Sequence, residues 1–245
     1  MRTLKIGLCG FSLAIAEYPR WFPLVEVQQT FYQPPAENVM RRWRETMPPG
    51  FEFTLKAWQL ITHVASSPTY RRLKRPLTSR EKSDAGGFRD TPIVQEGWQA
   101  TLDCARIIGA TSVLFQCPAS FKPTPENTAN MASFFRRAQR PPGLRFLWEP
   151  RGPWPEEIVA SLCAAHDLVH VVDPFVNRTV THGFTYYRLH GITGTRHVYT
   201  DEELRRLQDM VPAAGTTYVL FNNIPRVDDA RRFGRLLGKG LVTQP

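Results

Sequence analysis

Short apolar runs, each five or six residues long and most of them closed by a polar residue, recur along the whole chain. Their composition, rich in β-branched and aromatic side chains, is typical of buried strands. The runs are LKIGLC at 4–9, LVEVQ at 24–28, FEFTLK at 51–56, SVLFQ at 112–116, LRFLWE at 144–149, LVHVVD at 168–173, TYYRLH at 185–190 and TYVLFN at 217–222. The pattern therefore predicts eight strands.

Helical patterns lie between several of these strands. Thr91-Pro92 and Thr124-Pro125 each place an N-cap residue before a proline at the first helical position. Thr200 and Glu203 have the spacing of a capping box. The predicted helices begin at Pro35, Pro92, Pro125, Pro155, Thr200 and Asp228, and Gly109 and Gly238 are the expected stops of the second and the last.

Strands that alternate with helices predict a parallel sheet with right-handed crossovers. Eight such strands in 245 residues match the size of one (β/α)8 TIM barrel, and we predict a single domain over residues 1–245. The barrel is expected to be slightly irregular, because the connections after strands one and six are too short or too broken for a proper helix. A doubly wound open sheet is the alternative.

A basic segment interrupts the alternation after strand three. Residues 71–90 hold seven basic and three acidic side chains and show no clear strand or helix pattern. We interpret the segment as an excursion from the barrel, either a solvated loop or a flap that guides anions.

Composition narrows the classes of function. Lys and Arg number 31 against 22 Asp and Glu, and the net charge of +9 favours anionic partners. The four cysteines, scattered and without a CxxC pair, predict reduced thiols in a cytoplasmic protein. No run of about 18 apolar residues is present, and the first residues do not resemble a signal peptide, so no membrane partner is expected.

Polar residues close seven of the eight predicted strands. In a parallel barrel the carboxyl ends of the strands share one face, where active sites are built. Polar residues at so many ends predict a prepared pocket, since buried charges are costly unless paired. The candidates at or just after these ends are Glu26, Gln28, Lys56, His63, Gln116, Glu149, Arg151, Asp173, Arg188, His190, Asn222 and Asn223.

Several short motifs at these positions resemble one known family. They include Val25-Glu26-Val27, Glu149-Pro150-Arg151, Tyr187 to Gly191 (YRLHG) and Phe221-Asn222-Asn223, in order over most of the chain. Together they resemble the YecE-like family, domain of unknown function 72. The resemblance implies a TIM barrel and no established activity.

The chain departs from the family's pattern at four positions. Gln28 stands where the family usually has Asn, and Cys9 where a small hydroxyl residue is usual. Gly152 follows Arg151 where a His is usual, and Ile224 follows Asn223 where an Asp is common. The last two departures remove ionisable groups near the candidate site.

The polar residues at the strand ends allow three interpretations of the protein's function. The first is an enzyme, a hydrolase or isomerase, or an enzyme-derived binder acting on a small anionic or phosphate-bearing ligand by acid–base chemistry. Its catalytic groups would be Glu149 and His190, with Glu26 and Asp173. Its ligand contacts would come from Lys56, Arg151 and Arg188 as anion clamps, and from Gln28, His63, Gln116, Asn222 and Asn223.

The other interpretations are a nucleic-acid-binding or nucleic-acid-processing protein that uses dispersed basic residues, and a scaffold with a degenerate pocket. No cofactor is predicted. A divalent metal on Glu26, Glu149, Asp173 and His190 is a further alternative, without the close spacing of a metal motif.

Overall fold

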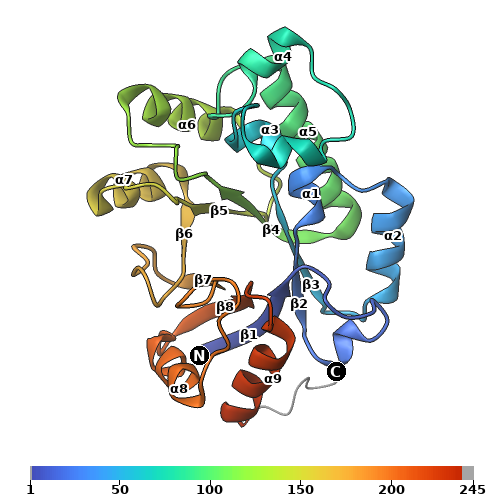
Figure 1. The fold of residues 1–245 in the computed structure, drawn as a ribbon, viewed down its shortest axis with the longest axis vertical. Helices are drawn as coiled ribbons and strands as arrows, with labels where there is room; N and C mark the ends of the chain where they lie inside the picture. The colour runs from blue at the N-terminus through green and yellow to red at the C-terminus, as the bar shows by residue number, and fades with distance from the viewer. Residues whose placement is uncertain (1, 239–245) are drawn as a thin grey trace. The chain divides into compact units, whose positions relative to one another are not determined.

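The computed structural model describes residues 2–238, and its eight strands close into a parallel barrel in sequence order (Figure 1). The predicted TIM barrel is confirmed, and the open-sheet alternative is wrong because β1 pairs with β8 in parallel register. The strands are β1 (Arg2–Cys9), β2 (Leu24–Val27), β3 (Glu52–Lys56), β4 (Ala110–Gln116), β5 (Arg145–Glu149), β6 (Leu168–Val172), β7 (Phe184–Leu189) and β8 (Gly215–Phe221).

The helices begin close to the predicted starts. They are α1 (Gln29–Tyr32), α2 (Glu37–Thr46), α3 (Gln59–Thr62), α4 (Ser79–Asp84), α5 (Pro92–Ile108), α6 (Pro125–Arg137), α7 (Glu156–His166), α8 (Asp201–Met210) and α9 (Arg226–Leu236), with 3₁₀ helices η1 (Tyr18–Arg20) and η2 (Pro68–Arg72). As predicted, the β1–β2 connection has only η1, and in the described chain no helix lies between β6 and β7.

Local capping explains where these helices begin and end. The Thr124 and Thr200 hydroxyls accept the backbone N–H of Asn127 and Glu203. The Thr91 side chain makes no such bond, because its Oγ1 donates to the Asp84 carbonyl at 2.9 Å. Helix α5 ends at Gly109, whose φ of 63° is a left-handed conformation that suits glycine.

The segment after β3 is more ordered than the sequence indicated. Residues 71–90 contain the end of η2 and the whole of α4, so the absence of helix predicted there is wrong. Thr78 and Glu81 form a complete capping box at the start of α4. Arg75 also bonds to Glu81 and Glu96, so part of the segment's charge is paired within it.

The chain divides into two compact units. The first takes its described residues from Met1–Val27, Glu45–Phe53 and Val169–Pro245, and the second comprises Gln28–Arg44 and Thr54–Leu168. The single domain over 1–245 stays a prediction, and each unit is described below by itself.

The first unit holds the contiguous strands β7, β8, β1 and β2 and most of β6. Alternate residues of a strand point to opposite faces. On β7 the Tyr187 hydroxyl donates to the Met210 carbonyl at the end of α8, so Tyr187 faces the helices. Tyr186 and Arg188 therefore face the other way, into the barrel. Figure 1 shows α8 and α9 packed outside β8 and β1.

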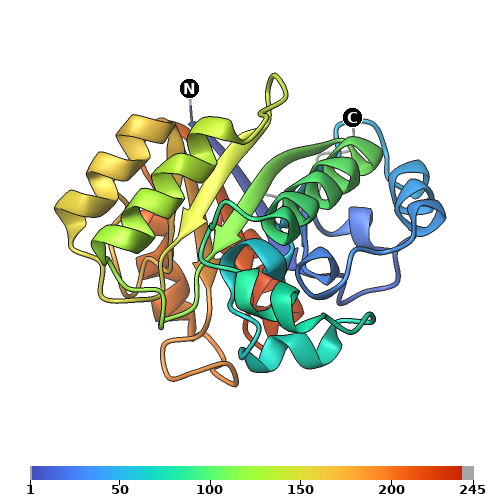
Figure 2. The same cartoon turned by 90° about the horizontal axis from the view of Figure 1, so that it is seen from above.

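The second unit packs around a cluster of aromatic rings. Phe115 on β4 contacts Trp98 on α5, Phe134 on α6 and Phe146 on β5, with centroid distances of 5.4–5.7 Å. Buried aromatic side chains of this size dominate the energy of a core. Helices α6 and α7 run side by side along this unit (Figure 2).

The four cysteines, Cys9, Cys104, Cys117 and Cys163, are buried, and all are free thiols. Burial raises the pKa of the Cys117 thiol to about 12, so this side chain stays protonated near neutral pH. No helix among residues 2–238 is long and apolar enough to cross a membrane.

Candidate functional site

Strand β7 carries a row of polar side chains in the interior of the first unit. Tyr186 and Arg188 are two residues apart on β7, so the strand directs both to the same face, and His190 follows the strand at the same spacing. Arg188 forms a bidentate ion pair with Glu26 of β2. The Nη2–Oε1 distance is 2.9 Å and the Nε–Oε2 distance is 3.1 Å. The Tyr186 hydroxyl also donates to Glu26 Oε2 at 2.8 Å.

This ion pair is fully buried, with side-chain exposures of 1% for Arg188 and 0% for Glu26. Both carboxylate oxygens accept hydrogen bonds from β7, so Glu26 ties β2 to β7 through the barrel interior. Arg188, predicted as an anion clamp, directs two of its nitrogens to a carboxylate of the protein. Glu26, Arg188 and Tyr186 thus form one buried polar network in the interior of this unit.

His190 lies immediately beyond the end of β7 and is half-buried. Its backbone N–H donates to Asp173 Oδ2 at 2.8 Å, and its Nδ1 lies 3.0 Å from Asn222 Nδ2. Asn222 follows β8 directly, and its own backbone N–H donates to the Leu189 carbonyl at 2.8 Å. The ends of three neighbouring strands, β6, β7 and β8, therefore fix the position of one histidine.

The contact with Asn222 bears on the tautomer of the His190 ring. With the amide nitrogen turned toward the ring, Nδ1 is the acceptor, and the proton of a neutral ring is then on Nε2. Asp173, predicted as a catalytic group, contacts backbone through both carboxylate oxygens. Its Oδ1 accepts the Phe175 N–H at 3.1 Å and its Oδ2 the His190 N–H.

Asn223 belongs to a separate buried cluster. Its Nδ2 donates to Asp229 Oδ2 at 2.6 Å and to the His197 carbonyl at 2.9 Å. Burial raises the pKa of Asp229, whose Oδ2 also accepts the Tyr199 N–H. The cluster anchors the β7–α8 loop to α9, and the ligand contact predicted for Asn223 stays a prediction.

In the second unit, Glu149 and Arg151 are brought together as their spacing predicted. Arg151 Nε donates to Glu149 Oε1 at 2.8 Å. The Glu149 side chain is 4% exposed and that of Arg151 36%, so the arginine is the accessible member. Gln116 at the end of β4 lies in register with Glu149 at the end of β5.

Lys56 and His63 share a third partner, the ring of Phe31. Lys56 Nζ lies 3.6 Å from the centroid of that ring, a cation–π contact, and His63 meets the same ring edge-on. Burial, with a smaller effect of the Lys56 charge, lowers the pKa of His63 to about 3. His63 is therefore neutral near pH 7, and its Nδ1 lies 2.7 Å from Thr62 Oγ1.

Gln28 is half-buried, and its carbonyl accepts the Phe31 N–H at 3.2 Å at the start of α1. Tyr186 was missed at the sequence level, although it is two residues before Arg188 and so shares its face. Phe31 was likewise not assigned a site role; nothing in the sequence indicated that Lys56 and His63 would both pack on its ring.

The side chains that the structure describes do not form a set of ligands that matches the alternative of a metal site. Among residues 2–238, no three His, Cys, Asp or Glu side chains are grouped as metal ligands. Glu26 already accepts from Arg188 and Tyr186, and Asp173 from two backbone N–H groups.

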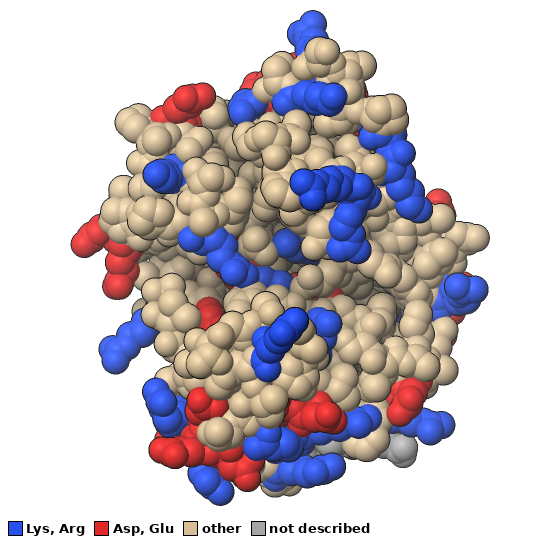
Figure 3. All heavy atoms as spheres, viewed as in Figure 1, with Lys and Arg blue, Asp and Glu red and all other residues tan. Residues whose placement is uncertain are grey.

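Basic side chains are spread over the face in Figure 3, and where α8 and α9 lie they mix with acidic ones. Several are paired locally: Arg41 with Glu37, Arg106 with Asp103, and Arg232 with Asp201. Arg178 and Arg196, on the loops after β6 and β7, are exposed and make no ion pair within the described chain.

Comparisons with known structures support the fold. The chain resembles a DUF72 family protein from Thermotoga maritima at 19% identity, with a TM-score of 0.71, covering 97% of this chain and 100% of the other. It also resembles a family 2 AP endonuclease from Brucella melitensis (10% identity, TM-score 0.56, covering 96% and 99%). A D-psicose 3-epimerase gives 11% identity and a TM-score of 0.54, covering 98% and 100%.

These likenesses, all below 25% identity, establish the TIM-barrel fold alone. The sequence has no significant match among curated proteins. The model of the family described as "Protein of unknown function DUF72" matches residues 11–245, nearly the whole chain. The resemblance drawn from the strand-end motifs is thereby confirmed, and the chain belongs to the DUF72 family.

Proposed function

We propose that this protein is an acid–base enzyme, or a binding protein derived from one, for a small anionic or phosphate-bearing ligand. Its core lies at the ends of β6, β7 and β8. The observation that carries the proposal is the placement of His190. His190 is half-buried, its backbone N–H donates to Asp173, and its ring Nδ1 lies 3.0 Å from Asn222 Nδ2. Acid–base catalysis requires a titratable group held in one orientation.

His190 is the proposed proton donor and acceptor, acting through Nε2. Asn222 and Asp173 are positioning residues. Glu26, Arg188 and Tyr186 form a buried polar network in which each charge has a partner, and a network held in this way limits the rearrangement needed when ligand charge approaches.

Two exposed arginines on the loops of this unit favour an anion. Arg178 and Arg196 lie on the loops that follow β6 and β7, and neither makes an ion pair among residues 2–238. Uncompensated cations near a site attract anions and accelerate their encounter with it. In the second unit, Arg151 and Lys56 are further proposed anion contacts, with Gln116 and Gln28 as hydrogen-bonding groups and Glu149 as a second acid–base candidate.

The epimerase and the AP endonuclease with this fold act, by their names, on a sugar and on nucleic acid respectively. A sugar phosphate combines a hydroxylated carbon skeleton with an anionic group, and it is therefore our preferred class of ligand. The local pairing of surface arginines does not favour a polymeric nucleic acid over a small anion.

The test is calorimetric titration with inorganic phosphate, ribose 5-phosphate and fructose 6-phosphate. We expect at least one to bind the wild-type protein, and binding to weaken tenfold or more in His190→Gln. His182→Gln is the matched control, because His182 is exposed and lies in the same unit. Binding that is unchanged in His190→Gln would refute the site, and binding of none of the three would favour the scaffold interpretation.

Two assays separate the reaction classes. An isomerase that works by proton transfer removes a carbon-bound hydrogen of its ligand as a proton and returns one that can come from solvent, so incubation in D₂O would introduce deuterium into the sugar phosphate. A phosphoester hydrolase would release phosphate from the same compounds. Loss of either activity in His190→Gln, with retention in His182→Gln, supports acid–base catalysis by His190.

A further inference from the structure

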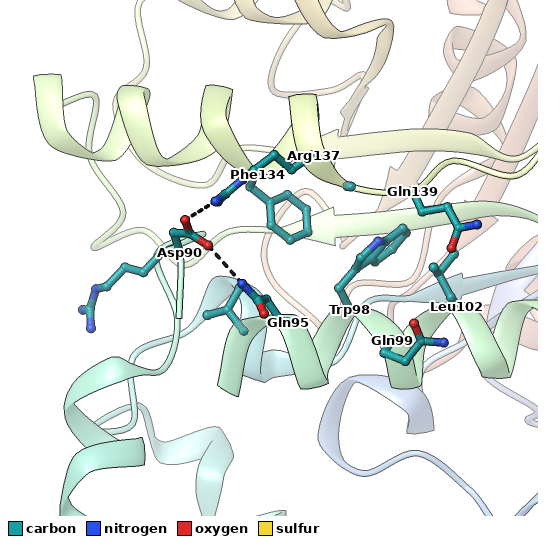
Figure 4. A pocket seen from close by; sticks show the side chains of 11 residues that line it. Asp90, Gln95, Trp98, Gln99, Leu102, Phe134, Arg137 and Gln139 are labelled. Carbon is teal, nitrogen blue, oxygen red and sulfur yellow. Dashed lines mark hydrogen bonds and ion pairs between the residues drawn. The ribbon is translucent and has the colours of Figure 1, made fainter. Parts of the chain in front are cut away.

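A separate cavity of about 280 Å³ opens between α5 and α6 in the second unit (Figure 4). Its volume is just below the range of about 300–1,000 Å³ that is typical of ligand sites. The cavity can therefore hold a ligand of one small ring system. None of its lining residues belongs to the strand-end clusters described above.

Helix α5 supplies one wall as two parallel stripes. Val94, Trp98 and Leu102 are four residues apart and form the apolar inner stripe. Gln95 and Gln99 form the adjacent outer stripe and are exposed. The end of α6 supplies the opposite wall with Phe134 and Arg137, followed by Gln139. A slot between two helices, apolar inside and carboxamide-rich outside, favours a flat ligand.

Hydrogen bonds close one end of the slot and orient its amides. Asp90 pairs with Arg137 and accepts from Gln95 Nε2, which links the two walls (Figure 4). Gln99 Nε2 donates to Asp103 Oδ1 at 2.9 Å, and Gln139 Oε1 accepts from Arg106 Nη2 at 3.4 Å.

These bonds leave one polar atom of each amide available to a ligand. Gln95 Oε1 and Gln99 Oε1 are acceptors, Gln139 Nε2 is a donor, and none has a partner in residues 2–238. At the inner wall the Trp98 indole N–H is buried and also lacks an acceptor.

We propose that this cavity binds a planar heteroaromatic ring with donors and acceptors along its edge, the chemistry of a nucleobase. Carboxamides match such an edge, because one amide offers a donor and an acceptor side by side. The apolar stripe would contact the face of the ring, and the glutamines would form hydrogen bonds with the donors and acceptors along its edge. The site is distinct from the strand-end cluster, so its test does not depend on the proposed function.

The test titrates adenosine, guanosine, cytidine and uridine separately, observing ligand binding by saturation-transfer NMR and affinity by calorimetry. We expect at least one nucleoside to bind. Gln99→Leu and Gln139→Leu should each weaken it about three- to tenfold, the effect of one lost hydrogen bond. Gln208→Leu on α8 is the matched control, and His190→Gln should bind as the wild type does.

Three outcomes would overturn the proposal. The first is that no nucleoside binds at millimolar concentration. The second is that Gln99→Leu and Gln139→Leu keep the wild-type affinity. The third is binding only to a single-stranded oligonucleotide, with an affinity that falls steeply with salt, because phosphate attraction rather than the cavity would then explain it.

Discussion

Arg188 on β7 and Glu26 on β2 form an ion pair inside the barrel in which neither side chain has more than 1% of its surface exposed. Two charges are stable there only because the geometry is bidentate and Tyr186 supplies a further hydrogen bond. Arg188 is also only two residues before His190, the proposed acid–base group.

Removing one member of this pair should destabilise the fold strongly. Arg188→Met leaves the Glu26 carboxylate buried without its main partner, and we expect a loss of about 3–5 kcal/mol in the free energy of unfolding. The double variant Arg188→Met with Glu26→Leu should lose clearly less. Urea denaturation measures both, and a double variant less stable than the single one would contradict this account.

The tautomer of His190 should depend on Asn222. In Asn222→Leu the amide donor is gone, so the neutral ring is no longer restricted to the Nε2–H form. Nitrogen-15 NMR of the ring should show one tautomer in the wild-type protein and a mixture in the variant. An unchanged ring spectrum would show that Asn222 does not position His190.

His63 should make stability depend on pH in the acid range. Its folded-state pKa of about 3 lies below the unfolded value of about 6.5, so the unfolded chain binds the proton more readily. The contribution is fully present above pH 6.5 and is lost as the pH falls toward 3, by about 1.4 kcal/mol per unit. The slope of stability against pH should be smaller in His63→Gln, and equal slopes would contradict the assignment.

Gly152 should not tolerate a side chain. A Cβ at this position would lie 2.8 Å from the Phe121 carbonyl oxygen and 3.1 Å from that of Ala119. We expect Gly152→Ala to lower the free energy of unfolding by about 1–3 kcal/mol. Chemical denaturation tests this, and wild-type stability would show that the backbone moves aside easily.

The barrel was predictable because strand and helix signals are local. Thr124-Pro125 and the Thr200–Glu203 box marked helix starts that the structure confirms. The Thr78–Glu81 box carried the same signal and was missed, because the charges around it dominated the pattern of residues 71–90.

The candidate site was predictable as a set of residue types and not as a set of contacts. The spacing of Glu149 and Arg151 indicated a pair that the structure contains. The pairing of Glu26 with Arg188 joins residues 162 positions apart, and no local pattern encodes it. The roles of Asp173 and Asn223 also depend on which backbone groups happen to lie nearby, which the sequence does not reveal.

The most direct test of the central claim is the NMR signal of the His190 ring during titration with inorganic phosphate, assigned through His190→Gln. Our account predicts that the Nε2 and Cε1–H signals of His190 shift saturably while those of His182 stay unchanged. Phosphate that binds without moving the His190 signals would contradict the claim that this histidine is at the ligand site.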